Sequence, residues 1–107
     1  MTVADWLDAR SPAPPAQLLD RLRAALGPAL VYDAAEVSHA FVDAAETLLA
    51  SLLGDGCVKR DQALDLLVVD ALVTYAFEAA SDDPQSLDTR AHDVMRRLGE
   101  LAARASP

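Results

Sequence analysis

The chain has 107 residues, of which 52% are hydrophobic and 24% are charged, and its formal net charge is −8. This length fits one domain with a single core, and the balance of apolar and charged residues excludes both a disordered chain and a membrane-spanning one. Because the negative charge repels phosphate backbones and anionic lipid surfaces, we expect neither a nucleic-acid partner nor membrane association.

The composition favours helices over strands. Ala and Leu are abundant, aromatic residues make up only 5%, and no run of alternating apolar and polar residues indicates a strand. We therefore predict an all-α fold, a small helical bundle of four main helices plus a short N-terminal helix. One domain over residues 1–107 contains the whole bundle.

The N-terminal segment predicts a short helix and a stiff connector. Thr2 and Asp5 have the spacing of a capping box, which opens a helix over residues 3–9. The segment 11–15 contains three prolines, which cannot continue this helix. The rest of the bundle is expected over residues 15–105.

The next two helices have recognisable ends. The second helix is predicted over residues 15–26, because Gly27 is followed directly by a proline and supplies a stop. Asp33 and Glu36 again have the spacing of a capping box and predict a long helix over residues 33–53. An apolar stripe along this long helix indicates the face that the core covers.

The fourth helix, predicted over residues 58–80, carries apolar side chains in nearly every direction around its axis. Such a helix is normally covered on most sides, so we expect it to be central, flanked by the third and fifth helices. Asp70, Thr74 and Glu78 form a narrow polar strip on this helix. The strip has two interpretations, a solvent-facing window or a contact to a partner or a small pocket.

The fifth helix is predicted to follow Asp83 as its cap, with Pro84 at its first position. Apolar residues then recur at intervals of four and three, which fits either the seam of a bundle or a short coiled-coil contact. The members of this stripe are Leu87, Ala91, Val94, Leu98, Leu101 and Ala105.

The fourth and fifth helices predict self-association. Together the long helices present more apolar surface than one small bundle covers, so we expect a homodimer or a helical protein partner. The predicted interface residues are Leu66, Val69, Val73, Phe77, Leu87, Val94, Leu98 and Leu101.

A second hypothesis concerns metal binding by Glu36, His39, Asp43 and Glu46, whose spacing places four metal-capable side chains on one helical face. Glu36 and His39 have the Glu-x-x-His spacing of di-iron carboxylate bundles, so oligomerisation could complete a ferritin-like site. The alternative without a metal is a solvent-exposed helix face. These four side chains lie opposite the apolar stripe, whereas the ligands of bundle metal sites project into the core.

A third hypothesis is a small apolar ligand in the bundle core, oriented by Asp70, Thr74 or Tyr75. Trp6 is interpreted as an anchor that holds the N-terminal helix on the bundle, with an interface hot spot as the alternative.

The remaining signals argue against an enzyme. Phosphate-binding loops, nucleophile elbows and zinc-type cysteine pairs are all missing from the sequence, so we expect no cofactor. Cys57 is the only cysteine, and the N-terminus lacks a leader-like segment, which indicates a reducing, cytoplasmic location. The sequence thus predicts a non-enzymatic, self-associating interaction module, with metal or ligand binding as alternatives.

Overall fold

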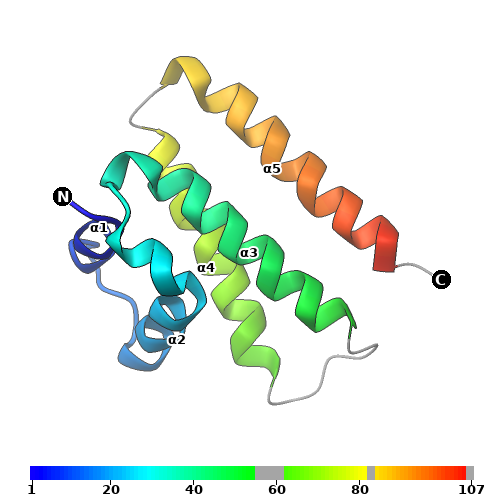
Figure 1. Cartoon of the computed structure of the whole chain (residues 1–107), viewed down its shortest axis with the longest axis horizontal. Helices are drawn as coiled ribbons and strands as arrows, with labels where there is room; N and C mark the ends of the chain where they lie inside the picture. The colour runs from blue at the N-terminus through cyan, green and yellow to red at the C-terminus, as the bar shows by residue number, and fades with distance from the viewer. Residues whose placement is uncertain (55–61, 82–83, 106–107) are drawn as a thin grey trace.

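The computed structural model describes residues 1–54, 62–81 and 84–105, and every regular element in these ranges is helical (Figure 1). This confirms the predicted all-α bundle of four main helices and a short N-terminal one. The elements are α1 (Val3–Asp8), α2 (Ala16–Leu26), the 3-10 helices η1 (Gly27–Val31) and η2 (Ala34–Glu36), α3 (Val37–Gly54), α4 (Ala63–Ala80) and α5 (Pro84–Ala105). Within these ranges, no helix is both long and apolar enough to cross a bilayer.

A capping box starts α1, as the sequence predicts. The Asp5 backbone N–H donates to the Thr2 hydroxyl at 3.2 Å, and the Thr2 N–H donates to the Asp5 carboxylate at 3.0 Å. The Thr2 backbone N–H, followed by its hydroxyl, lowers the pKa of the Asp5 carboxyl. The Val3 N–H also donates to the Tyr32 carbonyl at 2.8 Å, so the N-terminus is tied to the segment that precedes α3.

Two predicted helix boundaries are corrected. Pro15 is the N-cap of α2 and not its first residue, whereas Gly27 ends α2 as predicted and has a left-handed φ of 51°. Asp33 caps the 3-10 turn η2 by accepting a hydrogen bond from the Ala35 N–H at 2.9 Å, and α3 begins only at Val37. The predicted start of the fourth helix at residue 58, the Asp83 cap and Cys57 lie outside the described residues.

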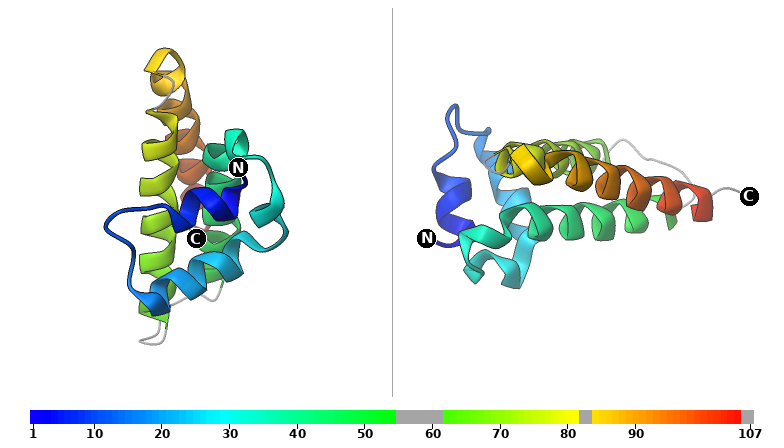
Figure 2. Two further views of the ribbon diagram at one scale, coloured as in Figure 1. Left: turned by 90° about the vertical axis from the view of Figure 1, so that its left-hand side faces the viewer. Right: turned by 90° about the horizontal axis from the view of Figure 1, so that it is seen from above.

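Helices α3 and α4 form the centre of the bundle, and α1 and α2 cross one side of this pair while α5 lies on the other (Figures 1 and 2). The chain direction alternates between α3, α4 and α5, so these helices are antiparallel neighbours (Figure 1). Their axes are tilted relative to one another, so α4 and α5 diverge toward the C-terminal end of α5 (Figure 1).

Three aromatic rings hold the first helix against this central pair. Phe41 of α3 is fully buried, and its ring meets the edges of Trp6 at 5.6 Å and of Tyr75 at 6.3 Å between centroids. Edge-to-face pairs of this kind contribute beyond their burial. Trp6 is itself buried, and the Arg10 guanidinium stacks 3.6 Å from its ring centroid, so Trp6 is the anchor of α1.

The expectation that the fourth helix is covered on nearly all sides is wrong for the single chain. One face of α4 is buried against its neighbours, but the opposite face is exposed. The side of α4 away from α3 has no described element packed over it, because α1, α2 and α5 reach only its flanks. The buried face consists of Val68, Val69, Leu72, Ala76 and Ala80, and the exposed face includes Leu66, Leu67, Asp70, Thr74 and Glu78.

We expect Phe41→Ala to lower the free energy of unfolding by about 3–5 kcal/mol, because it leaves a cavity in the aromatic cluster. Urea unfolding followed by circular dichroism measures the loss. Val31→Ala is the matched control, since Val31 is 77% exposed and its truncation should change the free energy of unfolding by less than about 0.5 kcal/mol. Equal effects of the two substitutions would contradict the central position of Phe41.

Candidate functional site

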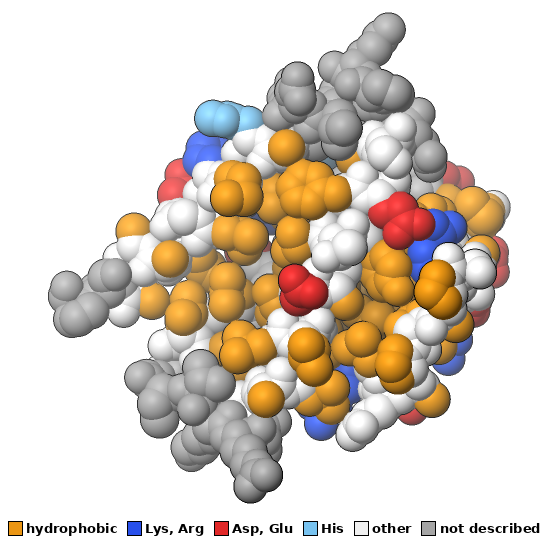
Figure 3. Space-filling view, turned by 180° about the vertical axis from the view of Figure 1, so that it is seen from behind, with side chains coloured by type: hydrophobic (Ala, Val, Ile, Leu, Met, Phe, Trp, Pro, Cys, Tyr) orange, Lys and Arg blue, Asp and Glu red, His pale blue; other side chains and the backbone are white. Residues whose placement is uncertain are grey.

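The most distinctive surface is an apolar face shared by α4 and α5, which we call the α4–α5 face. Leu66, Leu67 and Met95 are 38%, 58% and 66% exposed, and the other exposed large apolar side chains of the described residues are Met1, Val31, Tyr32 and Leu53. Val73, Phe77 and Leu98 are half-buried beside them. Seen from behind, this side of the molecule is largely apolar, with few acidic side chains (Figure 3). Exposed apolar side chains that gather on one side of a molecule commonly mark an interaction site.

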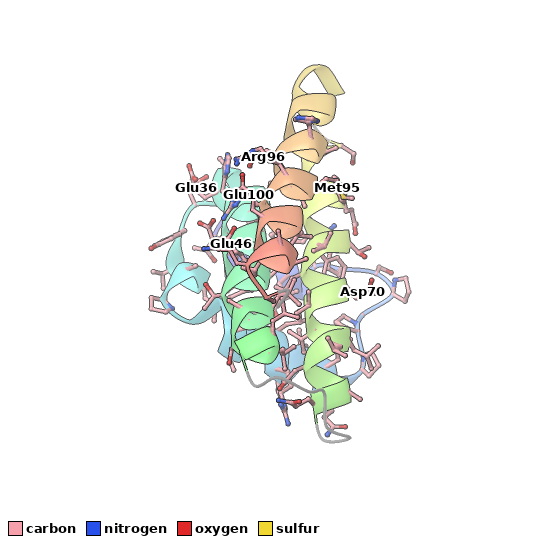
Figure 4. All side chains as sticks on the ribbon, turned by 90° about the vertical axis from the view of Figure 1, so that its right-hand side faces the viewer. Glu36, Glu46, Asp70, Met95, Arg96 and Glu100 are labelled. Carbon is pink, nitrogen blue, oxygen red and sulfur yellow. The ribbon has the colours of Figure 1, made fainter. Side chains whose placement is uncertain are left out.

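Helical periodicity explains why these residues share a face. On α4, Leu66, Val73 and Phe77 follow one another at intervals of seven and four residues, which keeps them on one side of the axis. On α5, Met95 and Leu98 are three residues apart, and Figure 4 shows Met95 on the same side of the molecule as Asp70.

The structure corrects part of the predicted interface. Val69, Val94 and Leu101 are buried within the chain, because the stripe of α5 and the inner edge of α4 pack into the bundle itself. The spacing on α5 is therefore a bundle seam, so these three residues are not available to a partner. Of the other predicted residues, Leu66, Val73, Phe77 and Leu98 remain accessible, and the side chain of Leu87 lies outside the described residues.

Sequence reasoning missed Leu67 and Met95, the two most exposed members of the α4–α5 face. A signal for Met95 was present, because it is an apolar residue beside the heptad stripe and directly before two arginines. Leu67 had a weaker signal, since it lies in an apolar run over residues 66–69, and only packing distinguishes the buried side chains of this run from the exposed ones.

Asp70 lies within the apolar surface of α4. It is exposed, and within the described part of the chain it forms no hydrogen bond or ion pair. The other described carboxylates of α4 are neutralised: Asp65 pairs with Arg21 at 2.9 Å and Glu78 pairs with Arg10 at 2.7 Å. Asp70 is therefore the one unpaired charge that α4 presents.

The three candidate ligand-binding residues do not converge. Tyr75 lies in the aromatic cluster beside Trp6, with ring centroids 6.0 Å apart, whereas Asp70 and Thr74 are exposed on the outer face. In the described part of the chain, every buried side-chain nitrogen or oxygen has a hydrogen-bond partner. No buried polar group there is left to orient a small ligand, so the geometry does not favour the ligand hypothesis.

A cluster of charged side chains joins α3 to α5 on the opposite side of the molecule (Figure 4). The Arg97 guanidinium donates to Asp43 at 2.7 Å and to Glu46 at 2.9 Å, and its side chain is only 20% exposed. The hydrogen bonds that Arg97 donates to Glu46 and then to Asp43 raise the pKa of Arg97. Neighbouring Arg96 bonds to Asp93 and Glu100 and lowers the pKa of Asp93.

This cluster uses part of the predicted metal face. Asp43 and Glu46 both bind Arg97, and Glu36 lies in η2 and not on the continuous α3 helix. His39 is exposed, and among the described residues no three His, Cys, Asp or Glu side chains are grouped closely enough to hold a metal ion. The geometry favours an ion-pair bridge between α3 and α5 over a metal site.

We expect Arg97→Ala to reduce the free energy of unfolding by about 1–2 kcal/mol, because it leaves two carboxylates of α3 unpaired and removes a half-buried bridge. Arg96→Ala is the matched control: its pairs lie within α5 and are solvent-exposed, so stability should hardly change. Urea unfolding at low and high salt compares the two variants, and the same loss in both would refute a special role of Arg97.

Comparison with protein-family models, with curated proteins and with solved structures gives no match to this chain.

Proposed function

We propose that this protein is a non-enzymatic, cytoplasmic interaction module that self-associates through the α4–α5 face. The observation that carries the proposal is the exposure of Leu67 and Met95, together with Leu66, on one side of the bundle. Fully burying a side chain such as Leu or Met contributes about 1.5–3 kcal/mol relative to leaving it in water. A second copy that covers this face supplies the missing neighbours.

A second copy would have to associate through apolar contact and not through long-range electrostatic attraction. The chain carries a net charge of −8, which repels another copy at long range. Charged residues of α5 such as Arg96 and Glu100 lie on the far side of that helix from Asp70 and Met95 (Figure 4). A basic partner would find one unpaired carboxylate on α4. The other exposed side chains of the face are apolar, so an apolar surface such as that of a second copy complements them better.

The size of the face predicts a modest affinity. An 18-residue helix such as α4 is about 27 Å long, and two adjacent helices are together about 20 Å wide. Two copies therefore bury on the order of 1,000 Å² in total, which is near the lower end for specific interfaces. Association costs at least about 4 kcal/mol in lost rotational and translational freedom, so we expect a dissociation constant in the micromolar range.

We expect Leu67→Glu and Met95→Glu each to shift the protein to monomer, because each places a new charge where the second copy excludes water. Sedimentation velocity over a series of protein concentrations measures the change in dissociation constant, which should exceed about tenfold. Glutamate is a good helix former, so the fold is retained.

Val31→Glu is the matched control, since Val31 is exposed but lies in η1, away from the α4–α5 face. It should leave the association unchanged. A wild-type protein that stays monomeric at high micromolar concentration would overturn the self-association proposal.

A further inference from the structure

A groove of about 270 Å³ lies between α2, η1 and α3, where η1 links the two helices (Figure 1). Its walls are short side chains: Ala25 of α2, Ala29 of η1, and Ala40 and Ala44, which are one turn apart on α3. Methyl groups of this size leave the space between the helices unfilled. None of the lining residues belongs to α4 or α5, so the groove is separate from the α4–α5 face.

Three polar side chains line the same groove, namely Tyr32, Asp43 and Thr47. Asp43 and Thr47 are four residues apart on α3, so they lie on the same side of that helix. Tyr32 follows η1 directly and is 52% exposed, which leaves part of its ring open to water. A small-molecule site commonly has this form, with mostly apolar walls and a few polar groups that orient the ligand.

The side chains around the groove carry an excess of negative charge. Among the described residues that line it, Asp43 is a carboxylate and none is basic. One oxygen of Asp43 accepts a hydrogen bond from Arg97 at 2.7 Å, yet the Asp43 side chain is still 67% exposed. Arg97 also pairs with Glu46 at 2.9 Å and with Asp93 at 3.9 Å. One guanidinium is thus shared among three carboxylates, so it does not cancel the charge of Asp43.

The end of α2 adds to this negative potential. Ala25 and Leu26, which line the groove, are the last two residues of α2. The C-terminal end of a helix carries a partial charge of roughly half an elementary negative charge, which favours a cation. Arg23, the basic residue of this last turn, is already paired with Asp8. The net charge of −8 acts in the same direction, so a positively charged group complements the groove.

We propose that this groove binds a small organic ammonium ion, with its positive group at Asp43 and its apolar body against the alanine walls. A water molecule takes up about 30 Å³ in the liquid, so the groove has room for a ligand of roughly nine non-hydrogen atoms. The Tyr32 ring supplies a further contact, because aromatic rings attract cations and pack against apolar groups. This site differs from a ligand site in the bundle core, since its polar groups line an open groove.

The test is a titration of the ¹⁵N-labelled full chain with 2-phenylethylammonium chloride, a probe of this size, followed by amide chemical shifts. We expect a dissociation constant on the order of 1 mM, and the largest shifts at groove amides such as those of Ala29 and Ala44. The alcohol 2-phenylethanol has nearly the same shape without the charge and should bind about tenfold more weakly. Phenylacetate has the opposite charge and should not shift these amides.

Two substitutions test the groove in different ways. Asp43→Asn removes the charge but keeps an oxygen that can accept from Arg97, so the fold is retained and binding of the ammonium ion should weaken about tenfold. Ala44→Leu fills the groove with a good helix former and should abolish binding. Asp20→Asn is the matched control, because it changes the net charge equally at an exposed position of α2 outside the groove. It should bind like wild type, and circular dichroism checks the helix content of every variant.

Several results would overturn the proposal. These are equal binding of the ammonium ion and the alcohol, equal binding by wild type and Asp43→Asn, and no shift of the groove amides at tens of millimolar ligand. Unchanged binding by Ala44→Leu would do the same, because the ligand would then lie elsewhere. None of these results bears on self-association through the α4–α5 face, which sedimentation tests separately.

Discussion

The packing of α3 against α4 around Phe41 is the contact on which the rest of the structure depends. Phe41 is fully buried, and the rings of Trp6 and Tyr75 meet it at their edges, so one side chain joins the N-terminal helix to the central pair. This arrangement fixes which side of α4 faces inward. Since α4 is apolar on nearly every side, turning Leu72 and Ala76 inward leaves Leu66 and Leu67 outside.

Much of the fold could be predicted from local chemistry. The Thr2 capping box and the stop at Gly27 depend on residues close in sequence, so their signals are complete within a few positions. The exposure of α4 could not be predicted in this way. An all-round apolar helix indicates that it needs cover, but the sequence does not say whether the cover comes from the same chain. The 3-10 turn η2 was missed because Asp33 has the same capping pattern in either helix type.

The roles of the charged residues could not be predicted from local sequence either. Asp43 and Glu46 have metal-compatible spacing, but the partner that decides their role, Arg97, lies more than fifty residues away in the sequence. Such long-range ion pairs form only because α5 packs against α3, and no local sequence pattern predicts them. The heptad stripe was ambiguous for a related reason: Val94 and Leu101 fit a bundle seam and a coiled coil equally well until their burial is known.

Carboxylates are paired with arginines on both sides of the bundle, and Asp70 is the exception on α4. Between α3 and α5, carboxylates are held by Arg97, which fixes the two helices within one chain. On the outer face of α4, Asp70 stands without a cation among apolar side chains. A chain of this length buries roughly 65% of the surface that it exposes when unfolded, so an apolar excess must remain on the surface. The unpaired carboxylate of Asp70 opposes burial of the apolar side chains around it, because removing a charge from water without a partner is unfavourable.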